Sequence, residues 1–345
     1  MDPERSPQEQ GRAADGAVLA VIAVLMALTG ALFPVPMWLV APVPLAVLAY
    51  RHGYRLSIIT AVLAVVLVGY VEQQVFAGLS QVAPAAQLRF SLLGIMVVPV
   101  TLGLIGLVIG GAWREGASAG QTFALTVLAA LLPGAVFWVG VRLVHGVDLL
   151  QVFMDNSLLL AKAVVEQAGE TGLGPDAVGE WRAMIQDAER GFPLIRPFLP
   201  GSAVVTAGVL AAVNMTLARL LLVRAGERPA WFPPFGAWRF PWPLALGFVA
   251  GHGLLLAGAA AGMDGLAIAG ENLRVMFHWL FTVQGLAIGW YWLERRLAPA
   301  WRVLILAVLF LWAPALLAWA GVLDTWFNFR RLPHPEDEGE PGGAR

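Results

Sequence analysis

Residues 90–111 read FSLLGIMVVPVTLGLIGLVIGG, an apolar run without a charged side chain. A helix that crosses a hydrocarbon core of about 30 Å needs roughly 20 such residues, so this run is long enough to cross once. Similar runs recur from Ala17 to Ala320, and the short stretches between them hold most of the Arg, Asp, Glu, Pro and Trp. This alternation is typical of a chain that crosses a membrane repeatedly.

The composition also indicates a membrane protein. Hydrophobic residues make up 59% of the 345 residues, charged residues make up 13%, and the mean hydropathy is +0.73. Soluble proteins carry about 25% charged residues. Because the excess apolar surface requires lipid, the lipid bilayer is the first partner that we expect.

We predict an all-α, polytopic membrane helix bundle with about nine transmembrane segments and a small extramembrane helical insert. The segments are Ala17–Phe33, Met37–Tyr50, Leu56–Phe76, Phe90–Gly111, Thr122–Val144, Leu199–Val223, Pro243–Ala261, Asn272–Trp292 and Val303–Ala320. The second is short, and prolines in and just before it interrupt helical hydrogen bonding. We predict that it is kinked or partly re-entrant.

These segments divide the chain into five parts. A cytoplasmic N-terminal tail (1–16) precedes helices 1–5 (17–144), and a polar insert (145–198) precedes helices 6–9 (199–321) and a polar C-terminal tail (322–345). Apolar residues of the insert recur at helical spacing on both sides of the sequence TGLGPD. We therefore expect two amphipathic helices that lie on the outer membrane face.

The arginines predict the orientation. A cytoplasmic N-terminus places the following loop arginines inside: Arg51, Arg55, Arg114, Arg224, Arg228, Arg239, Arg295, Arg296 and Arg302. Only Arg89 and Arg274 then fall in short outer loops, as the positive-inside rule requires. We predict a multi-pass protein of the bacterial cytoplasmic (inner) membrane with its N-terminus inside. An odd number of segments places the C-terminus outside, and one segment fewer, such as a second segment that does not span, would place it inside.

Several kinds of chemistry are not expected. The chain has no cysteine, which excludes disulfides, thiolate zinc sites and Cys-ligated clusters. Its five histidines lack metal-site spacing, and the sequence contains no phosphate-binding glycine loop with Lys and Ser/Thr. We expect no metal, no cofactor and no enzymatic activity. The basic loops are interpreted as topology signals, so no nucleic acid is expected as a partner.

Residues 116–120, GASAG, fit the G-x-S-x-G pattern of a serine nucleophile elbow. That motif requires a strand before the serine, and no strand is predicted here. An intramembrane serine hydrolase would need Ser118 to meet a histidine base, for which His252 is the candidate. The two residues are predicted on different sides of the membrane, so we favour a flexible linker.

Polar residues inside apolar segments are the candidate solute-binding residues, because burying them in lipid costs free energy. Asn214 lies near the middle of its segment, and glycines flank His252. Glu72 and Arg89 are predicted near the outer ends of their segments, where an anionic or zwitterionic solute would enter. Interhelical hydrogen bonding is the alternative for the first two residues, and a wet interface is the alternative for the others.

Small residues predict close helix contacts. Ala23, Ala27 and Ala31 fall four apart and form a flat stripe on which another helix could pack. Between residues 17 and 321, five G-x-x-x-G pairs begin at Gly106, Gly116, Gly247, Gly258 and Gly285. Random placement of the 38 glycines would give about four such pairs, so their number indicates only tight packing.

Three stretches of the chain carry a family resemblance. They are AVLMALTGALFPVPMWLVAPVPLAVLAYRHGYRLSIIT (23–60), NMTLARLLLVRAGERP (214–229) followed by WRFPWP, and GVLDTWFNFRRL (321–332). Together they resemble the YybS-like family of uncharacterised bacterial membrane proteins. The polar insert lies outside this resemblance.

The first stretch is also similar to the first three helices of S components of energy-coupling-factor vitamin transporters. The matching residues are Ala23, Ala27, Pro42, Pro44 and Gly53. In that family the alanine stripe contacts the coupling subunit, so the resemblance implies the same role for Ala23, Ala27 and Ala31. S components usually have about six helices, whereas about nine and an insert are predicted here.

Three functional hypotheses follow. The favoured one is a solute-binding membrane subunit in which helices near Asn214, Glu72 and Arg89 enclose a small-molecule solute, with an ATPase-linked coupling complex as its partner. The second is a non-enzymatic envelope scaffold or assembly protein that docks other membrane subunits through the acidic outer helices and the Trp-rich loop (224–243). The third is an intramembrane serine hydrolase.

Overall fold

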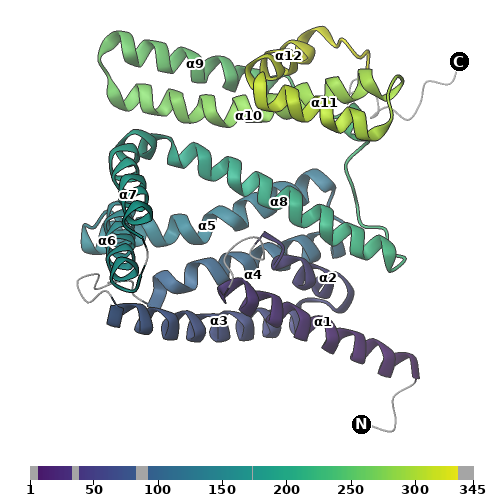
Figure 1. Cartoon of the computed structure of the whole chain (residues 1–345). Helices are drawn as coiled ribbons and strands as arrows, with labels where there is room; N and C mark the ends of the chain where they lie inside the picture. The colour runs from purple at the N-terminus through teal and green to yellow at the C-terminus, as the bar shows by residue number, and fades with distance from the viewer. Residues whose placement is uncertain (1–6, 33–38, 83–91, 173, 333–345) are drawn as a thin grey trace, which may run out of the picture. The chain divides into compact units, whose positions relative to one another are not determined.

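The computed structural model describes residues 7–32, 39–82, 92–172 and 174–332, and this part of the chain is helical without a β-strand (Figure 1). The helices are α1 (Pro7–Leu32), α2 (Pro42–His52), α3 (Tyr54–Val82), α4 (Leu92–Arg114), α5 (Ala119–His145), α6 (Leu149–Glu170), α7 (Pro175–Ile195), α8 (Leu199–Arg224), α9 (Pro243–Ala261), α10 (Asp264–Glu294), α11 (Pro299–Trp312) and α12 (Pro314–Phe327). The apolar runs are helical because a helix satisfies its backbone polar groups internally, as lipid requires. The predicted all-α class is confirmed.

The chain folds as two compact units, which are described separately. Unit 1 comprises Met1–Arg196 and Thr206–Trp231, and unit 2 comprises Pro197–Val205 and Phe232–Arg345. Among the candidate residues, Glu72 and Asn214 therefore belong to unit 1, and His252 belongs to unit 2.

Five helical stretches among the described residues are long and apolar enough to cross a membrane. They are Tyr54–Gln74, Met96–Arg114, Ala119–His145, Pro175–Arg224 and Pro243–Ala261, and the bent pair α11–α12 would make a sixth. The polytopic membrane bundle is confirmed, but the described chain has fewer such stretches than the nine predicted segments. α1 contributes only the shorter apolar stretch Ala14–Leu28. The continuous helix α10 carries polar side chains such as His278 and Gln284 and is not among the five stretches.

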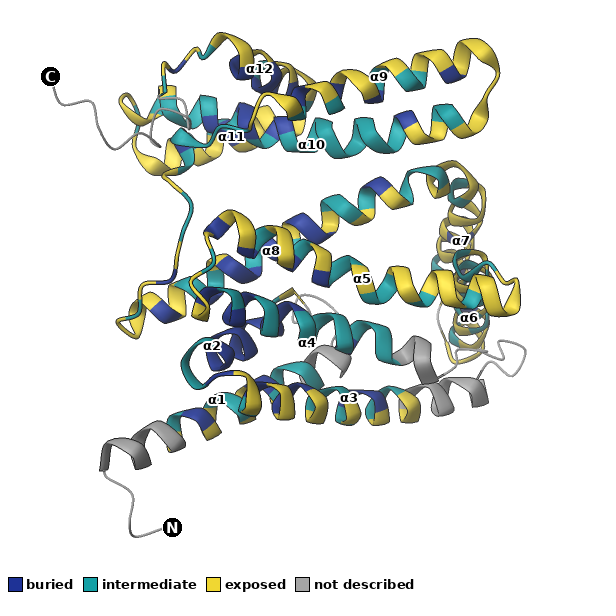
Figure 2. Cartoon of the chain, turned by 180° about the vertical axis from the view of Figure 1, so that it is seen from behind, coloured by how far each residue is buried: buried dark blue, intermediate teal, exposed yellow. Residues whose placement is uncertain are grey.

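The second predicted segment contains a short buried helix. α2 has 11 residues, so it is about 16 Å long, roughly half the thickness of the hydrocarbon core. Its residues from Pro42 to Ala49 are all buried (Figure 2). α4 can approach closely because it presents glycines: a Cβ on Gly110 would lie 2.1 Å from the Ala46 carbonyl oxygen, and one on Gly106 would lie 2.7 Å from the Pro42 carbonyl oxygen. This G-x-x-x-G pair is therefore a backbone contact.

Replacing Gly110 with alanine is expected to destabilise unit 1 by about 1–3 kcal/mol, because the new methyl group would overlap the Ala46 carbonyl and push α2 away. Gly120 belongs to a pair of the same spacing, but its Cβ position faces open space. Gly120→Ala should therefore be neutral or slightly stabilising. Thermal unfolding of the purified full-length variants measures the difference, and equal effects would contradict the contact.

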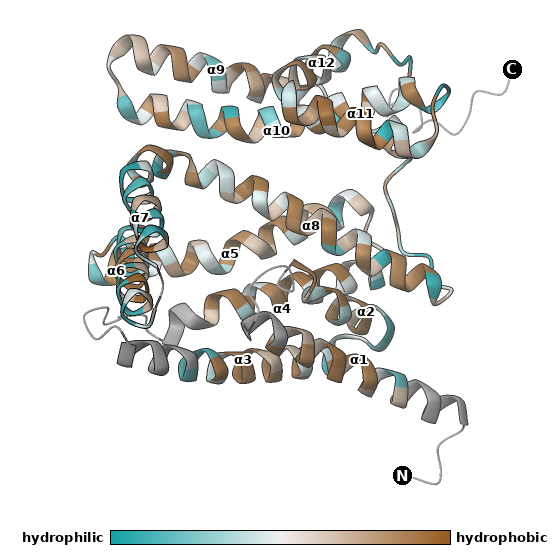
Figure 3. Cartoon of the chain, viewed as in Figure 1, coloured by the Kyte–Doolittle hydropathy of each residue, from teal (hydrophilic) through white to brown (hydrophobic). Residues whose placement is uncertain are grey.

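The polar insert contains two helices, α6 and α7, as predicted. Val165 of α6 packs on Val178 and Ile185 of α7, and Lys162 forms an ion pair with Glu189 across the pair. Many residues of α7 are hydrophilic, whereas apolar residues dominate the described parts of α3 and α4 (Figure 3). The pair thus has a small core of its own, and its position on the outer membrane face stays a prediction.

Unit 2 is built on backbone contacts between α10 and its neighbours α9 and α12. A Cβ on Gly258 of α9 would lie 2.4 Å from the Ala267 amide nitrogen of α10. A Cβ on Gly285 of α10 would lie 2.1 Å from the Leu317 carbonyl oxygen of α12, and one on Gly321 would lie 2.2 Å from the Phe281 carbonyl oxygen. Larger residues at these positions would separate the helices.

A buried ion pair joins the end of α12 to the Trp-rich loop. The side chains of Arg330 and Asp324 are both 0% exposed, and Arg330 Nη2 donates to Asp324 Oδ2 at 2.8 Å. Arg330 also donates to the carbonyl oxygens of Gly236 at 2.6 Å and Trp238 at 2.8 Å. We call these four residues the Arg330 latch. The last described residues and the Trp-rich loop therefore lie at the same end of unit 2.

The ninth predicted segment is a pair of short helices, α11 and α12. α11 and α12 have 14 residues each and are bent by 105° at Ala313. Each is about 21 Å long, too short to cross alone. Pro314 cannot continue the hydrogen bonding of α11, which explains the break. The latch joins the end of α12 to Gly236 and Trp238, and the side of the membrane on which the C-terminus lies stays a prediction.

Candidate functional site

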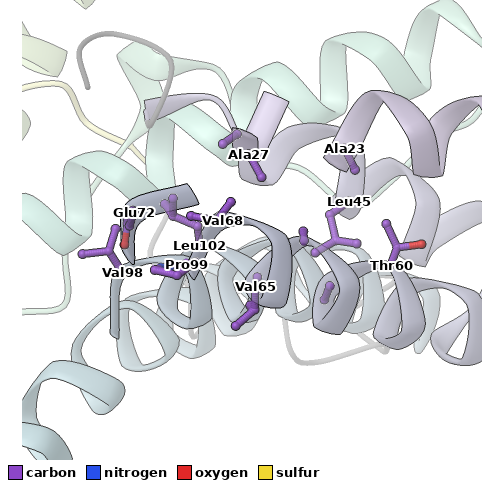
Figure 4. A pocket seen from close by; sticks show the side chains of 14 residues that line it. Ala23, Ala27, Leu45, Thr60, Val65, Val68, Glu72, Val98, Pro99 and Leu102 are labelled. Carbon is purple, nitrogen blue, oxygen red and sulfur yellow. The ribbon is translucent and has the colours of Figure 1, made fainter. Parts of the chain in front are cut away.

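Glu72 lines a narrow hollow of about 30 Å³ formed by residues of α1, α3 and α4 together with Ala41 and Leu45 (Figure 4). The wall is largely apolar, and Thr60 and Glu72 carry its only polar side-chain groups. A water molecule needs at least about 10–15 Å³ of such space, so the hollow holds one or two waters as it stands. We call this site the Glu72 hollow.

Two residues of the predicted alanine stripe also line the Glu72 hollow. Ala23 is buried at 5% exposure and packs with Leu45 and Ala61, and Ala27 is partly buried. The stripe therefore faces other helices of the same chain at these two positions. The side chain of Ala31 lies outside the described residues.

The Glu72 carboxyl has no counter-charge among the described side chains. It is partly buried, and no described residue forms a hydrogen bond or ion pair with it. Thr60 donates its hydroxyl to the Leu56 carbonyl at 2.9 Å, which leaves its oxygen able to accept. Pro99 in α4 lines the same wall and cannot donate to the Ile95 carbonyl. The arrangement suits a group that donates hydrogen bonds to a carboxylate.

Asn214 serves helix packing in the structure. It is 0% exposed, and its amide nitrogen donates to the carbonyl oxygens of Leu39 at 2.9 Å and Leu210 at 2.8 Å. It does not line the Glu72 hollow. The contacts agree with the alternative that Asn214 ties α8 to the segment before α2.

His252 lies in an aromatic cluster of unit 2. Its Nδ1 is 2.8 Å from the Phe248 carbonyl oxygen, and its ring centroid is 4.4 Å from that of Phe248 and 6.0 Å from that of Trp319. Because Nδ1 bonds within α9, the ring is held by its own helix. Arg89, the fourth candidate, lies outside the described residues.

A second, polar hollow was not predicted from the sequence. It measures about 610 Å³ and is lined by Tyr50, Arg51, His52, Trp113, Arg114 and Glu227, all in unit 1. We call it the polar vestibule. The sequence did carry a signal, because Arg51 and Arg114 were both assigned to the same membrane side, but loop charge alone does not reveal that their ends converge.

Ser118 caps α5. Its Oγ accepts a hydrogen bond from the Gln121 amide at 3.2 Å, and its own amide donates to Gln121 Oε1 at 3.0 Å, which completes a capping box. The residue before α5 thus has a local structural role. Among the described residues, no group of three or more His, Asp or Glu side chains is placed to hold a metal ion.

Comparison with known proteins gives one match. A family model described as "Predicted membrane protein (DUF2232)" matches residues 18–325, which include the Glu72 hollow, the polar vestibule and α9 to α11. No curated protein and no solved structure matches. The match covers most of the chain and agrees with several apolar helices in a multi-pass membrane protein.

Proposed function

The chain belongs to the family of predicted membrane proteins (DUF2232), and on that premise we propose that it is a solute-binding protein without enzymatic activity. We place it in the bacterial cytoplasmic membrane with its N-terminus inside. The observation that carries the proposal is the Glu72 carboxyl, which faces an apolar hollow and has no described counter-charge. An ionisable residue inside a membrane bundle is costly, and that cost points to a functional use.

The chemistry of the wall limits the solute. Apolar side chains around one carboxylate favour a small, mostly apolar molecule that carries an ammonium or another hydrogen-bond donor. Such sites commonly have volumes of roughly 300–1,000 Å³, whereas the Glu72 hollow holds about 30 Å³. Binding therefore requires α1 to move away from α3 and α4. Because Ala23 and Ala27 have small side chains, little packing free energy is lost at these two positions in that separation.

The resemblance of the first sequence stretch to S components is the second reason for proposing a solute-binding role for α1 to α3. The contact with a coupling subunit that this resemblance implies for Ala23 and Ala27 does not fit the structure, because both residues line the hollow and Ala23 is buried. We propose that these two alanines serve solute entry. An ATPase-linked coupling complex, if it binds, must use another surface.

Two substitutions test the solute site in purified full-length protein. We expect Glu72→Gln to weaken binding of a co-purifying amine about tenfold, because a hydrogen bond to a charged group is lost. We expect Ala27→Leu to block binding by filling the hollow. Native mass spectrometry of protein extracted from its own membrane identifies the solute, and titration of that solute gives the affinities.

Val66→Leu is the matched control, because Val66 lies on α3 with 58% exposure and does not line the hollow. It should bind like the wild type. If no small molecule is retained, or if both hollow variants bind the solute as well as the control does, the solute-binding proposal fails. Thermal unfolding of each variant separates lost binding from lost folding.

A further inference from the structure

The polar vestibule lies where three helices end. α2 ends at His52 and α4 ends at Arg114, and Glu227 follows the end of α8 at Arg224. Its volume of about 610 Å³ lies within the range of roughly 300–1,000 Å³ that small-molecule sites occupy. Helix ends that carry Arg, Tyr and Trp are typical of the membrane–water boundary, so we place the vestibule at the depth of lipid headgroups.

Two opposite charges remain unpaired in the vestibule. Arg51 is engaged by Asp15 of α1, with 2.6 Å between Arg51 Nη1 and Asp15 Oδ2, and His52 Nε2 lies 3.4 Å from the same oxygen. Arg114 and Glu227 line the same vestibule, but neither forms an ion pair with any described residue. Each therefore keeps its charge available for a ligand.

Arg114 is held in position by backbone. Its Nη1 donates to the Tyr50 carbonyl oxygen at 2.9 Å, and its Cζ lies 3.4 Å from where a Cβ on Gly53 would be. Gly53 has φ +83°, a conformation that glycine adopts without strain. The guanidinium thus lies over a glycine at the α2–α3 junction, with four of its five N–H groups free of that bond.

Trp113 contributes a largely buried side chain to the wall of the vestibule. Trp113 is 4% exposed and lines the vestibule, yet its Nε1 is buried without a hydrogen-bond partner among the described residues. An unsatisfied buried donor costs about 1–3 kcal/mol, so such donors are normally paired. The Trp113 nitrogen is not accessible from the vestibule, so the ligand contacts are assigned to Arg114 and Glu227.

We propose that the polar vestibule binds a zwitterion with a phosphate and a primary ammonium, the chemistry of a phosphoethanolamine headgroup. The phosphate accepts from Arg114, and the ammonium donates to Glu227. The headgroup belongs to a membrane phospholipid, because the vestibule is at headgroup depth and α3 beside it exposes Tyr54, Ile58 and Ile59 to acyl chains. This site is separate from the Glu72 hollow, and neither proposal depends on the other.

Lipid selectivity tests this assignment. Full-length protein is placed in nanodiscs that contain equal amounts of phosphatidylethanolamine, phosphatidylcholine and phosphatidylglycerol, and native mass spectrometry counts the lipids retained after gentle release. We expect selective retention of phosphatidylethanolamine. Phosphatidylcholine has the same phosphate but no ammonium N–H for Glu227, and phosphatidylglycerol has no cation. Equal retention of the three lipids would overturn the proposal.

Variants locate the selectivity. Glu227→Gln should reduce the preference for phosphatidylethanolamine over phosphatidylcholine about tenfold, because it removes the charged acceptor. Arg114→Gln should lower retention of both. Arg224→Gln is the control for charge alone, because Arg224 is exposed at the same end and does not line the vestibule. Selectivity unchanged in Glu227→Gln, or lost equally in Arg224→Gln, would contradict the site.

A soluble competitor separates the two sources of this headgroup chemistry. Free phosphoethanolamine at millimolar concentration is expected to displace little lipid, because it lacks the acyl chains that α3 contacts. If it binds the lipid-free protein tightly and displaces the lipid, the ligand is a soluble phosphate and the lipid assignment is overturned.

Discussion

Replacing Arg330 with alanine is expected to lower the free energy of unfolding of unit 2 by about 3–5 kcal/mol, because the substitution leaves the Asp324 carboxylate buried without its partner. Two carbonyl oxygens of the Trp-rich loop, at Gly236 and Trp238, lose their donor in the same step. The loop should detach from α12. Unfolding of the purified full-length protein by heat or by SDS titration measures the loss, and protease cleavage within residues 232–242 reports detachment.

Two comparisons isolate the latch. Arg331→Ala removes the same charge from the neighbouring residue, whose side chain is exposed, and it should cost little. The double variant Asp324→Asn with Arg330→Met removes both charges. It should lower the free energy of unfolding less than Arg330→Ala alone does, because no uncompensated charge stays buried. A loss in Arg330→Ala that is no larger than the loss in Arg331→Ala would contradict the role of the latch.

The helices could be predicted because their signal is local. Residues 90–111 carry no charge over a membrane thickness, and such a run is helical whatever surrounds it. The break at Pro314 could also have been predicted, since a proline inside an apolar run interrupts the helix. The segment predicted from Val303 to Ala320 did not include this break, whether or not the two helices together cross the membrane.

The contacts could not be predicted because they depend on the partner helix. Five glycine pairs have the same spacing, yet Gly110 lies against the backbone of α2 and Gly120 faces open space. Glu72 and Asn214 are equally anomalous in sequence, but one faces a hollow and the other bonds to the Leu39 carbonyl. Spacing gives the face of a helix, and only the fold gives what that face meets.

Arg330 illustrates the same limit for charge. In the sequence it reads as a surface residue of a polar tail, next to Arg331 and before the acidic PEDEGE stretch. In the fold Arg330 is buried. It bonds to Gly236, which is 94 positions earlier in the chain, and to Trp238, which is 92 positions earlier. The positive-inside rule treats each arginine as an exposed loop charge. It therefore cannot identify an arginine that is buried after a helix end, as Arg330 is.

Cysteine labelling is expected to place Pro241 and Arg331 on one side of the membrane and Met263 on the other. The three positions are exposed and belong to unit 2, and the chain has no native cysteine, so each single-cysteine variant reports one site. The physical reason is the latch, which fixes the end of α12 at the Trp-rich loop from which α9 departs. We expect that α9 crosses once, that α10 returns although it is not among the five long apolar stretches, and that α11–α12 enters and leaves from the same side.

The measurement uses a membrane-impermeant maleimide on intact cells and on inverted membrane vesicles, with detergent-solubilised protein as the fully labelled reference. We expect Pro241→Cys and Arg331→Cys to react in inverted vesicles, and Met263→Cys to react in intact cells, because the positive-inside rule puts the Trp-rich loop in the cytoplasm. The pairing is the stronger part of the result: a reversed orientation exchanges the two preparations but keeps Pro241 with Arg331.

Reaction of Arg331→Cys from the same side as Met263→Cys would mean that α11 and α12 together cross the bilayer. That crossing would separate Arg330 from Gly236 by the full hydrocarbon core, a distance over which neither the 2.6 Å hydrogen bond nor the buried pair with Asp324 could tie the loop to the helix.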